Sequence, residues 1–146
     1  MVTFLNLINN RAMTEQSKQE LVEYKALAAT FPEVSLYITA DVLVNTLEEG
    51  KALHDAGQWG GSEEDYQEGL EFFKASLDIN LDNVSKFGVD PKSIEDKENG
   101  DFWKWLRFWK AWDDTLTDEV RNDIDIKLSD NQNVDEYLPA KKWNEL

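Results

Sequence analysis

A chain of 146 residues is long enough to bury one hydrophobic core, and the absence of cysteine excludes a disulfide scaffold and any thiolate metal site. Its 30 acidic residues against 15 basic ones give a net charge of −15, which repels nucleic acid and anionic lipid and favours a basic partner surface. Because 41% of the residues are hydrophobic and 12% aromatic, burial can offset the entropy of ordering, which excludes a disordered chain.

The first residues lack the basic region and the apolar run of a secretion signal, and no later stretch approaches 18 consecutive apolar residues. The sequence therefore predicts a cytoplasmic protein that neither spans nor binds a membrane. Residues 1–12 precede the first clear helix signal, Thr14, and are expected to be a loose leader. Translation can begin at Met1 or at Met13.

The sequence predicts a first helix that Thr14 begins and Pro32 ends, because apolar residues recur between them at helical spacing. They are Leu21, Tyr24, Leu27, Ala28 and Phe31.

A second helix is predicted after Pro32, with Ser35 as its cap. Its apolar positions, Leu36, Ala40, Leu43 and Leu47, follow helical spacing. The alternative over 34–44 is a strand, because this stretch is rich in β-branched residues. Its alternation is poor and no hairpin signal follows, so we favour the helix.

The glycine-rich turn at 57–61 precedes a third helix, which Ser62 and Asp65 are expected to cap. Gly88 and Pro91 mark its end. Its apolar stripe consists of Tyr66, Leu70, Phe73, Leu77 and Leu81.

The fourth predicted helix, 101–112, holds four of the six tryptophans and is expected to organise the core. Asn99 or Asp101 is its expected cap. Trp103 falls on the cationic side, where its ring can stack on the guanidinium of Arg107. The remaining large apolar residues share one broad face, namely Phe102, Trp105, Leu106, Phe108, Trp109 and Trp112.

Thr117 is expected to begin a fifth, shorter helix, although the alternation over 123–128 also suits a strand. Pro139 begins a tail, 139–146, whose Trp143 is expected to dock on the domain. Together these patterns predict an all-α protein, a single compact bundle of about five helices with a loosely docked C-terminal tail. The whole chain, 1–146, is expected to form one acidic helical domain.

No pattern in the sequence indicates catalysis, a metal or a cofactor. The only histidine, His54, falls on an apolar helix line and is expected to be a satisfied core residue. Asp78, Asn80 and Asp82 match the first ligand positions of a calcium loop. The match fails at Asn83, where glycine is required, and at Val89, where the bidentate glutamate belongs.

The feature that does suggest a function is a row of five carboxylates on the third predicted helix. Helical geometry places them within about 80° of one another, on a different face from the apolar stripe. We call Glu64, Glu68, Glu71, Asp78 and Asp82 the acidic row. Such a row can imitate the phosphates of a nucleic acid. Phe72 beside it is expected to serve as an apolar anchor, or else to reach a neighbouring helix. Trp103 and Arg107 complete the set of expected partner-binding residues.

The leading interpretation is a non-enzymatic protein that binds a basic, nucleic-acid-binding protein without itself contacting nucleic acid. Nucleic-acid mimics of this type serve phages and mobile elements as anti-defence inhibitors. The comparison with them is an analogy of functional type. The alternative is a small helical accessory or scaffold subunit, oligomeric through surplus tryptophan surface, whose acidity serves only solubility.

Overall fold

The computed structural model describes residues 15–145, apart from the side chain of Asn144. Within these residues there are five α-helices and no strand. The helices are α2 (Glu15–Ala28), α3 (Glu33–Asp55), α4 (Glu63–Val84), α5 (Asp101–Asp113) and α6 (Asp118–Ser129). Short 3-10 turns, η1 (Ser85–Phe87), η2 (Pro91–Glu95), η3 (Asp135–Tyr137) and η4 (Trp143–Glu145), complete the described chain.

The all-α bundle expected from the sequence is confirmed. Residues 34–44 lie in α3 and residues 123–128 lie in α6, so helix prevails over strand in both segments. The predicted leader, 1–12, and the choice between Met1 and Met13 fall outside the described residues. No helix of the described chain is both long and apolar enough to cross a membrane.

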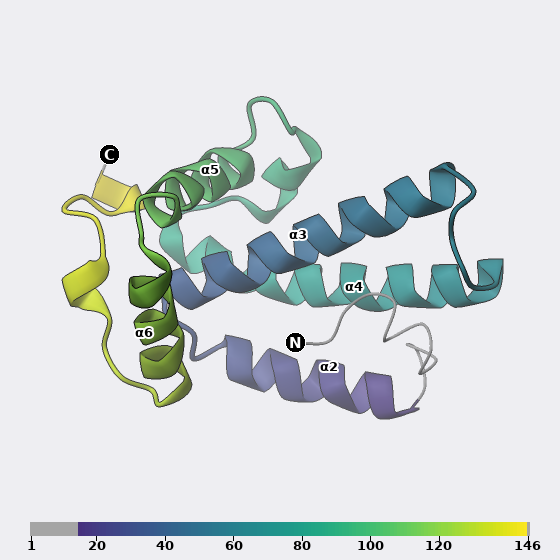
Figure 1. Cartoon of the computed structure of the whole chain (residues 1–146), viewed down its shortest axis with the longest axis horizontal. Helices are drawn as coiled ribbons and strands as arrows, with labels where there is room; N and C mark the ends of the chain where they lie inside the picture. Colours follow the sequence, from purple (N-terminus) through teal and green to yellow (C-terminus); the bar gives the residue numbers. More distant parts are fainter. Residues whose placement is uncertain (1–14, 146) are drawn as a thin grey trace.

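The longest elements, α3 and α4, form an antiparallel hairpin along the length of the molecule (Figure 1). Helix α2 packs along α4, whereas α5 packs against α3 and η2. Helix α6 crosses the end of the hairpin where α3 begins (Figure 1). The end of the hairpin where α3 turns into α4 therefore projects away from α5 and α6 (Figure 1).

The tryptophan helix organises the core where α5 meets α3. Phe102 and Trp105 are 0% exposed and Trp109 is 1% exposed. Tyr37 of α3 stacks on Trp109 with ring centroids 6.2 Å apart and meets Trp105 edge-on at 6.3 Å. Such aromatic contacts add specific geometry to a large burial of apolar area.

Hydrogen bonds confirm the predicted cap at Ser62 and show that Thr117, the expected start of the fifth helix, is its N-cap. The Ser62 hydroxyl accepts from the Asp65 backbone N–H at 3.1 Å, and the Thr117 hydroxyl accepts from the Val120 N–H at 3.2 Å. Each bond satisfies one of the backbone donors left free at a helix start. The short polar side chain directly before an acidic first turn was a sufficient local signal.

Two other caps differ from the prediction. Helix α3 begins at Glu33, two residues before Ser35, because Pro32 occupies the N-cap position in an extended conformation. The N-cap of α5 is Gly100, not Asn99 or Asp101. A β-carbon on Gly100 would lie 2.0 Å from the Ser93 carbonyl oxygen, so only glycine permits this close approach.

Helix α2 also departs from the prediction at its C-terminal end. It stops at Ala28 and not at Pro32, and Leu27 is 57% exposed instead of facing the core. Tyr24 and Phe31 are half-buried and contact each other, with ring centroids 6.5 Å apart. Thr14, the expected start, lies outside the described residues.

The chain after α6 packs on α5. The Trp112 indole N–H donates to the Tyr137 carbonyl oxygen at 2.8 Å, and Val134 is 4% exposed. The ring of Trp143 lies 6.1 Å from that of Phe108, which confirms the predicted docking of the tail tryptophan.

Candidate protein-binding surface

Helix α4 is divided into a buried face and an acidic face. Tyr66, Phe73, Leu77 and Leu81 are each at most 8% exposed where α4 packs against its neighbours. On the other face, every member of the acidic row is exposed except Glu68, which is partly covered. The helical period separates the two faces, so burial of the stripe fixes the direction in which the row points.

The acidic row runs along most of α4. Asp82 lies 18 positions after Glu64, a distance of about 27 Å along the helix at 1.5 Å per residue. Five charges over this length are sparser than the phosphates of one DNA strand, which recur about every 3.4 Å. Ala75 occupies the gap between Glu71 and Asp78. The row therefore matches the sign and the direction of a phosphate backbone, with a lower charge density.

None of the five carboxylates forms an ion pair within residues 15–145. Lys74, on the same helix, is exposed and forms no ion pair with the row. Neighbouring carboxylates three or four residues apart on a helix repel each other by a few tenths of a kcal/mol. The face thus carries charge that described side chains leave uncompensated.

The structure corrects the placement of Phe72. This side chain is only 9% exposed and meets Phe73 edge-on, with ring centroids 5.7 Å apart. It lies on the boundary between the two faces of α4, where it lines a groove together with residues of α2 and α3. Phe72 is therefore a core residue and not an exposed anchor beside the acidic row.

Trp103 and Arg107 lie on α5, a different helix from the acidic row, and do not join it in one cluster. The Trp103 indole N–H donates to the Ile94 carbonyl oxygen at 2.9 Å. The cation above its ring is Lys97, with Nζ 5.4 Å from the centroid. The expected stack on Arg107 is therefore corrected, because η2 and the following loop bring Lys97 to the ring.

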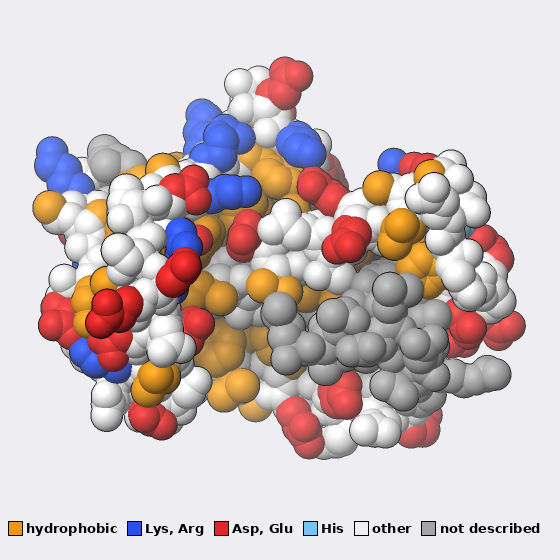
Figure 2. All heavy atoms as spheres, in the orientation of Figure 1, with side chains coloured by type: hydrophobic (Ala, Val, Ile, Leu, Met, Phe, Trp, Pro, Cys, Tyr) orange, Lys and Arg blue, Asp and Glu red, His pale blue; other side chains and the backbone are white. Residues whose placement is uncertain are grey.

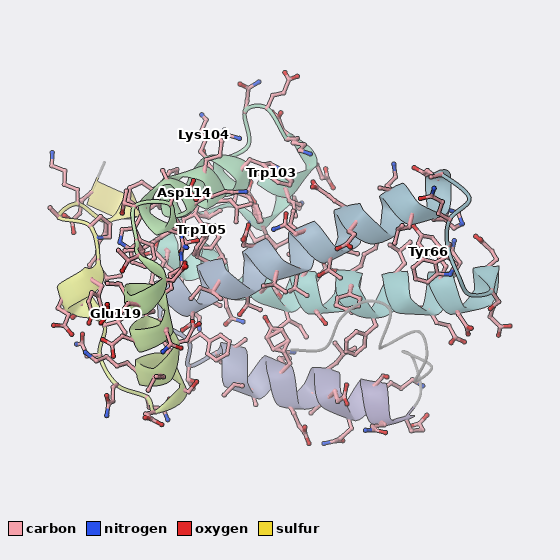
Figure 3. All side chains as sticks on the ribbon, viewed as in Figure 1. Tyr66, Trp103, Lys104, Trp105, Asp114 and Glu119 are labelled. Carbon is pink, nitrogen blue, oxygen red and sulfur yellow. The ribbon has the colours of Figure 1, made fainter. Side chains whose placement is uncertain are left out.

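The exposed side of α5 is basic. Lys104, Arg107 and Lys110 are exposed on it at three-residue spacing. Figure 2 shows Lys and Arg side chains gathered over this helix, and Figure 3 shows Trp103 and Lys104 side by side on it. The molecule thus carries a basic patch on α5 despite its large negative net charge, in addition to the acidic row on α4.

A polar cluster joins α3 to α4 at the end of the hairpin, where Figure 3 labels Tyr66. The His54 ring stacks on the Tyr66 ring, with centroids 4.0 Å apart and planes at 10°. His54 Nε2 lies 2.6 Å from a carboxylate oxygen of Glu63, and its side chain is 30% exposed. His54 therefore has the partners expected of it, but at the surface and not in the core.

The His54–Glu63 hydrogen bond raises the pKa of His54 above 6.5 and lowers the pKa of Glu63 below 4.5. A raised histidine pKa contributes stability that is complete below pH 6.5 and is lost as pH rises through the folded pKa. A lowered carboxyl pKa contributes stability that is present above pH 4.5 and is lost as pH falls through the folded pKa. The pair is therefore most stabilising between these limits, with Asp55 and Lys51 as the adjacent charges.

We expect the melting temperature to fall between pH 6 and pH 8.5, and the fall to be smaller in His54→Gln, which cannot carry the proton. Thermal unfolding at several pH values, with each protein compared to itself, measures the difference. Identical pH profiles for the two proteins would show that the His54–Glu63 pair contributes nothing in this range.

The segment that resembled a calcium loop is helical. Asp78, Asn80 and Asp82 all lie in α4, and Asn80 is 0% exposed. Its amide N–H donates to the Leu36 carbonyl oxygen at 3.1 Å, which ties α4 to α3. In the part of the chain that the structure describes, no group of three or more His, Cys, Asp or Glu residues is placed to hold a metal ion.

One arrangement had no signal in the sequence. The Glu33 carboxylate oxygen Oε1 accepts from the indole N–H groups of both Trp105 and Trp109, at 3.0 and 3.1 Å. These residues are 72 and 76 positions away along the chain, so only the fold brings them together.

No protein-family model, curated protein or solved structure matches this chain.

Proposed function

We propose that this chain is a non-enzymatic protein that binds a basic protein surface through the acidic row and occludes a nucleic-acid-binding site on that partner. The observation that carries the proposal is the exposed face of α4, which bears five carboxylates without an ion pair in residues 15–145. Exposed carboxylates need little desolvation before they meet lysine or arginine. Their linear order also suits a surface shaped to follow a phosphate backbone.

The net charge of −15 supports the choice of partner. Long-range attraction steers a basic protein towards this molecule and repels nucleic acid and anionic surfaces. The basic patch on α5 lies on a different helix and leaves the acidic row unopposed. The proposed activity is therefore competition: the protein occupies the site that DNA or RNA would otherwise fill.

The test is capture of partners from a lysate of the source organism on immobilised protein at about 50 mM salt, followed by elution with salt or with DNA. A charge-driven complex should dissociate by about 200 mM salt, and nucleic acid should displace the partner. A partner retained at high salt would favour the scaffold-subunit alternative. A partner that holds nucleic acid and this protein at the same time would contradict mimicry.

A further inference from the structure

A pocket opens between the start of α3, the end of α6 and the loop that follows α6. Its volume is about 490 Å³, within the range of small-molecule sites. Seven of its thirteen lining residues are apolar or aromatic, and the others are two carboxylates, one lysine and three side-chain amides. The residues that matter here are Glu33, Val34, Phe87, Trp109, Leu128 and Val134.

The carboxylate of Glu33 is fixed before any ligand arrives. Its Oε1 accepts both indole N–H groups of Trp105 and Trp109, so the side chain has one preferred position. No hydrogen bond from residues 15–145 reaches its Oε2. One oxygen of a positioned anion is therefore open to a donor, and preorganisation of this kind reduces the cost of binding.

The surroundings of Glu33 favour a cation on an apolar body. Trp109 and Phe87 offer aromatic rings beside the carboxylate, and Leu128 and Val134 offer aliphatic surface. Ammonium groups are attracted both by aromatic faces and by carboxylates, whereas a neutral or anionic group gains little from either. The net charge of −15 also raises the local concentration of small cations.

We propose that this pocket binds a small organic ammonium ion, which donates to Glu33 Oε2 and packs its apolar part against Phe87 and Leu128. The site is separate from the acidic row, and the inference does not depend on the proposed function. Two further charged residues line the pocket. Asp135 carries the favourable sign and Lys142 the opposing one, so Lys142 limits the affinity for a cation.

The experiment uses three probes of similar shape: phenethylamine, 2-phenylethanol and 3-phenylpropionate, which are cationic, neutral and anionic. Each is titrated into ¹⁵N-labelled protein at constant ionic strength. The indole N–H signals of Trp105 and Trp109 report on the site directly, because both groups bond to Glu33. We expect phenethylamine alone to shift these two signals in a saturable manner, while the indole signal of Trp112, which bonds to Tyr137, stays in place.

Two variants separate binding from folding. Glu33→Gln keeps an oxygen that accepts the indole N–H groups but removes the charge, and it should weaken phenethylamine binding by at least about tenfold. Lys142→Gln removes the opposing charge and should strengthen the binding of phenethylamine. The second variant and the three-probe comparison remain informative if Glu33→Gln folds poorly.

Three results would overturn the proposal. The first is equal binding of the cationic and neutral probes, which would indicate an apolar pocket without charge preference. The second is preferential binding of 3-phenylpropionate, which would assign the site to Lys142. The third is an absence of saturable shifts at Trp105 and Trp109 with phenethylamine.

Discussion

Replacing Trp109 with alanine should lower the free energy of unfolding by about 3–5 kcal/mol, the largest single-residue effect we expect in this protein. The side chain is 1% exposed, and its ring contacts Tyr37, Phe108 and Trp112. Its loss leaves a cavity at the junction of α5 and α3, which the surrounding rings can fill only in part. It also leaves Glu33 with one indole donor instead of two.

Denaturant unfolding followed by circular dichroism measures this change. Trp109→Phe retains much of the ring volume but removes the N–H. Its free energy of unfolding should lie between that of Trp109→Ala and that of the unsubstituted protein. Val22→Ala is the matched surface control, because Val22 is 63% exposed and its truncation should change stability by about 0.5 kcal/mol or less. A Trp109→Ala protein as stable as the parent would show that α5 does not organise the core.

The second large effect concerns the acidic row. In the double variant Glu68→Gln/Glu71→Gln, affinity for a basic partner should fall by about 2- to 30-fold, the range expected for losing two exposed charge pairs. Stability should stay the same or rise by a few tenths of a kcal/mol, because two like charges on one helical face no longer repel each other. Binding and stability should therefore move in opposite directions.

The matched control is Glu98→Gln/Asp130→Asn, which alters the net charge by the same two units. Both residues are exposed, neither side chain forms an ion pair within residues 15–145, and neither lies on α4. If the overall field alone drives binding, the two double variants should lose affinity equally. Isothermal titration with the captured partner, or with deca-arginine, distinguishes the two results.

The helices, the cap at Ser62 and the helix start at Thr117 could be predicted because their causes are local. Helical spacing placed 34–44 in α3 despite its β-branched residues, and Ser62 and Thr117 precede the backbone donors that they satisfy. Gly100 could not be identified in this way. Its role depends on the Ser93 carbonyl oxygen, which η2 places against it.

The acidic row could be predicted because all five of its residues lie on one helix, α4. The direction of the acidic row is set by the apolar stripe of α4, and both can be read from the period. The burial of side chains at the edge of that stripe is harder to predict, because it depends on neighbouring helices. Phe72 is one such side chain, and it lines a groove together with residues of α2 and α3. The docking of Trp143 was predicted, but other contacts that depend on the fold were missed, as with Lys97 above Trp103 and Glu33 between two indoles.

Mapping the binding of deca-arginine by NMR tests the central proposal most directly. In a titration of ¹⁵N-labelled protein at low salt, backbone amide shifts should be largest at Glu64, Glu68, Glu71, Asp78 and Asp82 and should disappear as salt is added. This result would locate the preferred cation-binding surface on α4. Shifts spread evenly over all exposed acids, or centred on the acidic residues of α6, would contradict the proposal that the acidic row is the binding surface.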